Sequence, residues 1–181
     1  MSLPPSHTLP SLSQPDQFRV LDTLFESSAD LHALMAPVLA SEAFASYAHL
    51  VDAVGTRLSA LATTHSPADR TVLLGILGSH PRLGRPPTVE AEALSELSRQ
   101  EQAQLNAGAQ DLAEQLARLN AEYEQTFPGL RFVTFVNGRS RPEIMAEMRR
   151  RIDRGQADRE IEATIQAMCE IGQDRARKLE K

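Results

Sequence analysis

The stretch Ser66-Pro67-Ala68-Asp69-Arg70-Thr71-Val72-Leu73-Leu74-Gly75-Ile76-Leu77-Gly78-Ser79-His80-Pro81 contains a complete helix signature. Ser66 followed by a proline is typical of a helix N-cap and the first helical position. Apolar residues then recur at helical spacing at Val72, Leu73, Ile76 and Leu77. Pro81 ends the pattern, because a proline disfavours helical backbone at the residue before it. The stretch therefore predicts an amphipathic helix that ends at a histidine.

The same periodicity extends to both sides of this stretch. Before it, helices are expected from about Asp16, the expected N-cap of the first, over Asp30 to Leu39 and over Ser41 to Leu61. After it, they are expected over 90–125, from Ser140, an expected N-cap, to Arg151, and from Ala157 into the C-terminus. Only Arg131 to Val136 looks like a strand, and it is too isolated to imply a sheet. The sequence predicts an all-α fold, a single helical-bundle domain of about seven to nine helices with one short extended connector.

The first 15 residues differ in composition from the rest. They contain four prolines and five serines or threonines, with neither a basic nor an apolar region of the kind that a signal peptide has. We therefore expect a disordered leader over 1–15 and the helical domain over 16–181.

Charge and cysteine content exclude several classes of protein. A net charge of −5 argues against a general nucleic-acid or membrane-surface binder, and no apolar run reaches the roughly 18 residues of a membrane span. The single cysteine, Cys169, excludes an internal disulfide and a cysteine-rich zinc site. None of the five histidines stands at the helical spacing of a metal site. We expect a small-molecule partner, with no nucleic acid, membrane or metal.

Three features carry candidate chemistry, and each also has an ordinary structural interpretation. His80 could act as an acid or base near neutrality, or simply stabilise the helix C-terminus. Ser98 and Glu101 could bring a carboxylate to that histidine, but they also fit a capping box. The extended segment around Phe132 could be core, or its backbone groups could bind a polar ligand. The run Arg149 to Arg151, and Arg175 in the last helix, are expected on a solvated face.

Several motifs, taken in order, resemble the 2-oxo-4-hydroxy-4-carboxy-5-ureidoimidazoline (OHCU) decarboxylase family of uric acid degradation. The resemblance covers residues from about 18 to 179. It is carried by Leu24-Phe25-Glu26, His80-Pro81, Ser98-x-x-Glu101-Gln102, Leu119-Asn120-x-x-Tyr123, the segment from Phe127 to Val136 with Gly138-Arg139, Ile144-Met145, Arg149 to Ile152, and Ile171-x-x-x-Arg175.

The resemblance implies an all-helical, cofactor-free decarboxylase that forms (S)-allantoin and is commonly a homodimer. It implies that His80 and Glu101 are catalytic. The substrate-binding positions that it implies are Pro81, Ser98, Gln102, Arg175 and the stretch Phe132, Val133, Thr134, Phe135 and Val136.

The chain departs from the usual family pattern at three places. Ser27 to Leu31 lacks the large aromatic residue that usually follows the Phe-Glu step, Leu105 to Gly108 replaces Ala-Gly-Leu, and Arg82 to Pro87 replaces an acidic or Ala-Gly loop. These departures keep open a same-fold enzyme that acts on a different ureido or imidazoline acid. A non-catalytic helical interaction protein is the third hypothesis. Arg82 and Arg85 could attract an anionic substrate, although a solvated loop is the simpler interpretation.

The compartment is expected to be the cytoplasm. Eukaryotic members of the family are often peroxisomal, so a peroxisomal location stays open, but the chain ends Lys178-Leu179-Glu180-Lys181 rather than in Ser-Lys-Leu.

Overall fold

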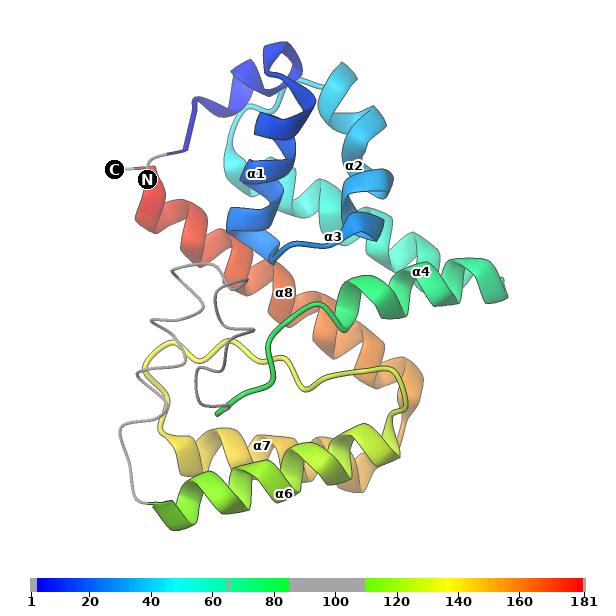
Figure 1. The fold of residues 1–181 in the computed structure, drawn as a ribbon, viewed down its shortest axis with the longest axis vertical. Coiled ribbons are helices and arrows are strands. Elements are labelled where there is room, and N and C mark those ends of the chain that lie inside the picture. The colour runs from blue at the N-terminus through cyan, green and yellow to red at the C-terminus, as the bar shows by residue number, and fades with distance from the viewer. Residues whose placement is uncertain (1–2, 65, 85–109, 181) are drawn as a thin grey trace.

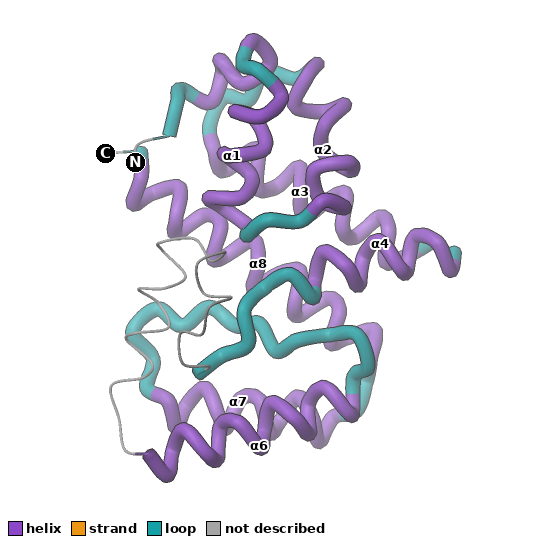
Figure 2. Tube along the Cα trace, viewed as in Figure 1, coloured by secondary structure: helices purple, strands orange, loops and turns teal. Residues whose placement is uncertain are grey.

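The structure, a computed structural model, describes residues 3–64, 66–84 and 110–180, with only the backbone for residues 110 and 111. Within this part of the chain every regular element is helical (Figures 1 and 2), so the predicted all-α fold is confirmed. The elements are η1 (Ser6–Ser11), α1 (Gln14–Phe25), α2 (Ala29–Ser41), α3 (Tyr47–Thr63), α4 (Pro67–Leu77), α6 (Gln110–Thr126), α7 (Arg141–Arg154) and α8 (Ala157–Leu179).

The long helix α8 organises the fold. It packs against α3, α1 and α4, while α6 and α7 pack against each other beside its N-terminal half (Figure 1). Its buried face is continuous and includes Ile161, Ile165, Met168 and Ile171. Burial of such an apolar stripe is the main favourable term in folding a helical domain. Side chains near both ends of α8 therefore take part in the interior.

Serine caps define most of the helix starts. The side chains of Ser13, Ser28, Ser46, Ser66 and Ser140 each accept a hydrogen bond from a backbone N–H in the first turn of the helix that follows. The predicted caps at Ser66 and Ser140 are confirmed. The cap predicted at Asp16 is wrong, because Ser13 caps α1 and Asp16 lies in its first turn. The third helix begins at Tyr47 rather than Ser41 because Ser46 caps it, and residues 42–46 are irregular.

The N-terminal segment differs from the disordered leader expected over 1–15. Leu9 is fully buried within η1, and the Gln17 side chain donates to its carbonyl at 2.9 Å. The Tyr47 hydroxyl donates to the carbonyl of Pro4 at 2.7 Å. Proline and serine content suggested disorder, but the apolar residues between them reach the core. These tertiary contacts were not visible in the composition.

The connector between α6 and α7 runs over residues 127–140 and contains no regular structure. It leaves α6 through a turn at Gly129, whose φ of 87° favours glycine. Figure 2 shows it passing beside the segment that follows α4. The extended connector predicted from Arg131 to Val136 is therefore present.

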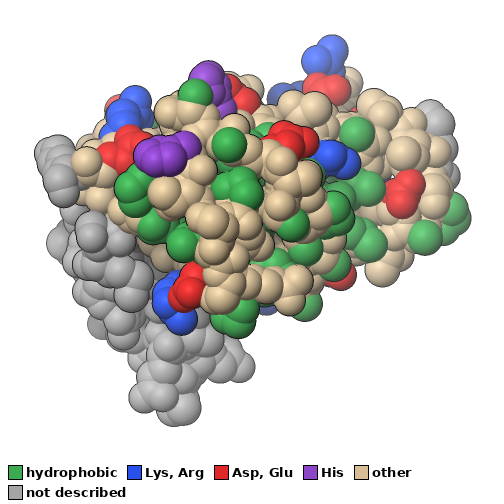
Figure 3. All heavy atoms as spheres, turned by 90° about the horizontal axis from the view of Figure 1, so that it is seen from above, with side chains coloured by type: hydrophobic (Ala, Val, Ile, Leu, Met, Phe, Trp, Pro, Cys, Tyr) green, Lys and Arg blue, Asp and Glu red, His purple; other side chains and the backbone are tan. Residues whose placement is uncertain are grey.

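The surface and the helices carry two further observations. On the face shown in Figure 3, Lys and Arg side chains lie scattered among acidic ones rather than gathered in one patch. Among the described residues, no helix is both long enough and apolar enough to cross a membrane.

Candidate active site

His80 lies at the centre of the candidate site, three residues beyond the end of α4. Its side chain is only 4% exposed. The backbone around it is held from two directions: Arg131 donates to the His80 carbonyl at 3.2 Å, and Asn120 donates to the Leu83 carbonyl at 2.9 Å. The loop is thereby fixed to both α6 and the connector. Pro81 lies within this fixed loop and is half-buried.

Arg82 is not the solvated loop residue that the sequence suggested. Its Nε and Nη2 atoms donate to the two carboxylate oxygens of Glu124 on α6, at 2.9 and 3.2 Å. This two-point geometry suits guanidinium and carboxylate, so Arg82 fastens the histidine loop to α6. Arg85 lies outside the described residues.

A buried ion pair lies beside His80. Glu26 follows α1 directly, and its Oε1 is 2.8 Å from Nη1 of Arg175 in α8. The two side chains are 4% and 1% exposed. Nη1 of Arg175 also contacts the carbonyls of Thr23 and Leu24, at 3.5 and 3.4 Å. The sequence alone suggested that Arg175 lay on a solvated face; the structure buries it.

The local backbone brings this pair together. Glu26 has φ 72° and ψ 157°, a region that is populated almost only by glycine and costs about 1–3 kcal/mol for other residues. One turn before Arg175, a Cβ on Gly172 would lie 3.1 Å from the ring of Phe25. The missing side chain lets α8 approach the end of α1 closely, so Arg175 reaches Glu26.

His80 is kept neutral by its surroundings. Burial lowers its pKa to about 4. The Glu26 carboxylate opposes this shift, whereas the Arg175 guanidinium adds to it. Its Nε2 atom is buried and has no hydrogen-bond partner among the residues that the structure describes. Buried polar atoms are rarely left without one, so a buried imidazole nitrogen in this state calls for a ligand.

The connector stretch lies next to this histidine, because Arg131, which binds the His80 carbonyl, directly precedes it. Phe132, Val133 and Thr134 are buried, and Phe135 and Val136 are half-buried.

The carbonyls and the N–H groups of this stretch differ in their hydrogen bonding. Val133 O accepts from Arg151 at 2.9 Å, and Phe135 O accepts from the Arg139 side chain at 3.3 Å. Within the described part of the chain, the backbone N–H groups of residues 132–136 donate to no acceptor. The stretch therefore offers donors to a ligand.

A second buried charge network contacts the connector, and it was not predicted from the sequence. Glu160, fully buried in α8, accepts from the Tyr123 hydroxyl at 2.5 Å, from Nε of Arg151 at 2.8 Å and from Arg154 at 3.1 Å. Arg151 also lies over the Phe132 ring, 4.6 Å from its centroid. The solvated face expected for Arg149 to Arg151 is thus wrong for Arg151. Its burial depends on Glu160 in the next helix, which the arginine run does not reveal.

The structure thus brings together four of the residue groups that the sequence singled out: His80, Pro81, the Phe132–Val136 stretch and Arg175. It adds Glu26, which the sequence marked only as part of a motif. Ser98, Glu101 and Gln102 lie outside the described residues. Within the residues that the structure describes, no group of three His, Cys, Asp or Glu side chains could hold a metal ion.

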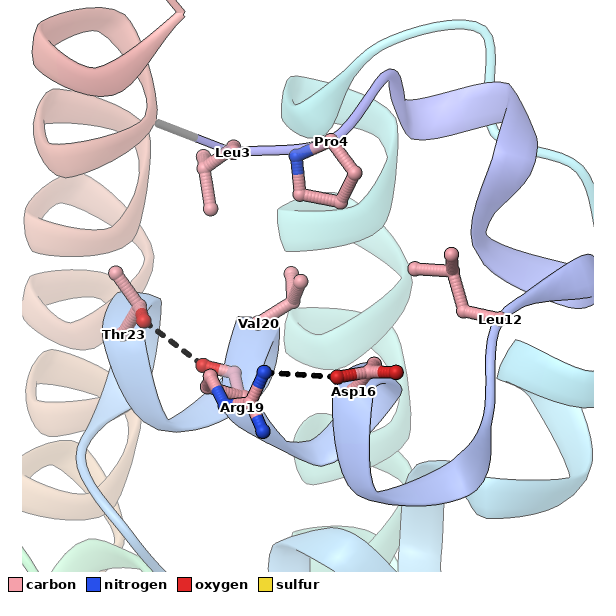
Figure 4. Close-up of a pocket in the computed structure, with 7 residues that line it drawn as sticks. All are labelled: Leu3, Pro4, Leu12, Asp16, Arg19, Val20 and Thr23. Carbon is pink, nitrogen blue, oxygen red and sulfur yellow. Dashed lines mark hydrogen bonds and ion pairs between the residues drawn. The ribbon is translucent and has the colours of Figure 1, made fainter. Parts of the chain in front are cut away.

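A cavity of about 260 Å³ lies elsewhere, between the N-terminal segment and α1. Figure 4 shows Leu3 and Pro4 on one side of it and α1 with Val20 on the other, with the Asp16–Arg19 ion pair at its edge. Its lining is mostly apolar and does not include His80, Glu26 or Arg175.

Residues 10–177 match the model of one protein family, described as OHCU decarboxylase. No curated protein matches the chain.

Proposed function

The chain belongs to the OHCU decarboxylase family, and from this premise we propose that His80 is the general base of a decarboxylation that yields (S)-allantoin. The protein is a carboxy-lyase of uric acid degradation. The observation that carries the role of His80 is its buried Nε2 atom, for which the described part of the chain supplies no hydrogen-bond partner.

The substrate supplies its own electron sink. One ring carbon of OHCU bears both the carboxylate and a hydroxyl, and the neighbouring ring carbon forms a C=N bond and bears the ureido group. When the C–C bond to the carboxylate breaks, its electron pair moves into the C=N system and CO2 leaves. The ring nitrogen that receives the electron pair takes up a proton, a second proton is added to the ureido-bearing carbon, and the hydroxyl loses its proton to become a carbonyl.

His80 suits the deprotonation of that hydroxyl. With a pKa lowered to about 4 by burial, its imidazole is neutral at physiological pH and accepts a proton through Nε2. The anionic substrate, once bound beside it, raises the basicity of the imidazole by favouring the charged form. Of the two roles that its residue type allows, acid and base, these surroundings favour the base.

Two further groups position the substrate. Arg175 offers a guanidinium suited to a carboxylate or ring carbonyl, and it is held at the end of α1 beside His80. The backbone N–H groups of the Phe132–Val136 stretch can donate to the ring oxygens. Such fixed donors orient a substrate at little entropic cost at the moment of reaction.

The remaining roles rest on the resemblance alone. We propose that Glu101 accepts hydrogen bonds from the ureido or ring N–H groups and that Ser98 and Gln102 add polar contacts. Pro81 fixes the geometry of the loop after His80. A homodimer is proposed on the same basis, and sedimentation of the purified chain tests it.

The test is an optical assay of uric acid passed through urate oxidase and hydroxyisourate hydrolase. Spontaneous decay gives racemic allantoin, so circular dichroism isolates the enzymatic product. We expect rapid formation of one enantiomer, and a loss of about 10²–10⁴ in rate in His80→Asn and in Glu101→Gln. A folded wild-type protein that gives no optical signal contradicts the proposed function, and full turnover by His80→Asn contradicts the role of His80.

A further inference from the structure

We propose that Glu26 is a positioning residue of the decarboxylase site, whose carboxylate fixes the Arg175 guanidinium and balances its charge beside His80. The inference rests on the proposed function and deepens it. It assigns a role to a buried acid that the reaction itself does not use.

The first argument is the geometry of the pair. The 2.8 Å contact between Glu26 Oε1 and Arg175 Nη1 is made by two side chains with almost no exposure. The same nitrogen contacts two carbonyls at the C-terminal end of α1. A guanidinium held by a carboxylate and by backbone carbonyls has little rotational freedom. Glu26, together with these carbonyls, therefore fixes the orientation of the Arg175 guanidinium.

The second argument is the backbone at Glu26. Its φ of 72° and ψ of 157° suit glycine, and a glutamate is held there nonetheless. The residue also ends α1, with its N–H bonded to the Asp22 carbonyl at 3.1 Å. A glycine would satisfy the turn but would remove the carboxylate that contacts Arg175. The turn therefore serves to deliver a carboxylate.

The third argument is the charge balance at His80. Three charged side chains of the described chain face this residue: Glu26 from the end of α1, Arg175 from α8, and Arg131 from the connector, which binds the His80 carbonyl. Glu101 is expected there too but lies outside the described residues. Glu26 favours the protonated imidazole and Arg175 disfavours it, so each offsets the other.

A cycle of variants tests this balance without relying on turnover. The imidazole of His80 is titrated by NMR in the full chain, with His80→Asn to assign its signal. In Glu26→Gln, Arg175 acts alone, so the titration midpoint should fall below that of the wild type, which is about 4. In Arg175→Gln, Glu26 acts alone and the midpoint should rise. In the double variant both charges are gone, and the midpoint should lie between those of the two single variants, because the two effects oppose each other.

Kinetics supply the second readout. Glu26→Gln keeps the size and shape of the side chain but weakens its hold on Arg175, so we expect KM for OHCU to rise about tenfold and kcat to change less. Glu26→Asp keeps the charge, so its His80 midpoint should stay close to that of the wild type. Glu160→Gln is a matched control, since Glu160 is an equally buried partner of an arginine in the other network. It should lower stability and leave the His80 midpoint in place.

The outcomes separate the inference from the proposed function. If Glu26→Gln lowers the melting temperature but changes neither the His80 midpoint nor KM, Glu26 is merely structural and the inference is overturned. If Arg175→Gln does not fold, Glu26→Gln and the double variant still decide. A wild type without decarboxylase activity overturns the function, and the NMR titrations then still report on the charge balance.

Discussion

Acid should destabilise this protein partly because His80 becomes protonated. The substitution His80→Asn should remove that contribution to the loss of stability. An imidazole with an ordinary pKa of 6.5 is held at about 4 in the folded chain. Between these values the unfolded chain binds a proton that the folded chain does not, so the free energy of unfolding falls as the pH falls. The stabilisation is therefore present above about pH 6.5 and is lost towards about pH 4. At about 1.4 kcal/mol per pH unit, the difference amounts to about 3 kcal/mol.

The assay is urea unfolding followed by circular dichroism, at about pH 7.5 and about pH 4, for the wild type and His80→Asn. The carboxylates that also titrate in this range are common to both proteins and cancel in the comparison. The wild type should lose about 3 kcal/mol more than the variant, or roughly 6–12 °C in melting temperature for a domain of this size. His49→Asn, at an exposed position in α3, controls for the substitution itself. Equal losses in the wild type and His80→Asn would refute the argument that His80 is buried as a neutral base.

Three further variants test the supporting framework. Tyr123→Phe removes a hydrogen bond to the buried Glu160 and should cost about 1–2 kcal/mol in urea unfolding, with the secondary structure unchanged. Arg151→Met removes one of the cationic partners of the buried Glu160 carboxylate and should cost about 3 kcal/mol of stability. An unchanged stability would show that the Arg151–Glu160 pair contributes nothing. Ser140→Ala breaks the capping box with Glu143 and should cost about 1 kcal/mol, seen as a lower melting temperature, whereas Ser140→Thr should cost less.

The local features of the fold were predictable from the sequence because their causes are local. Ser66 and Ser140 cap helices by bonding to backbone groups three residues away, and a serine with a proline one or two residues later reveals this directly. Leu9 shows the opposite case. It is fully buried because α1 and α2 fold over it, which the prolines and serines around it conceal.

The residues of the candidate site likewise fall into those that the sequence could predict and those that it could not. His80 was visible because a histidine before a proline at the end of an apolar helix is unusual in this chain. Burial of Arg175 was not, since its partner, Glu26, comes from the other end of the sequence through the packing of α1 on α8. Arg151 stands in a run of arginines that is typical of an exposed face, and only the opposing Glu160 explains why it is inside.

The two buried charge networks share one helix, and this limits which mutations the protein can tolerate during evolution. Glu160 and Arg175 lie in α8, 15 residues apart (175 − 160), which at about 1.5 Å per residue is roughly 22 Å of unbroken helix. Insertion or deletion of one residue between them would rotate one relative to the other by about 100°. One of two buried ionic groups would then face away from its partner. Substitutions can accumulate along α8, but its length between these two residues is fixed.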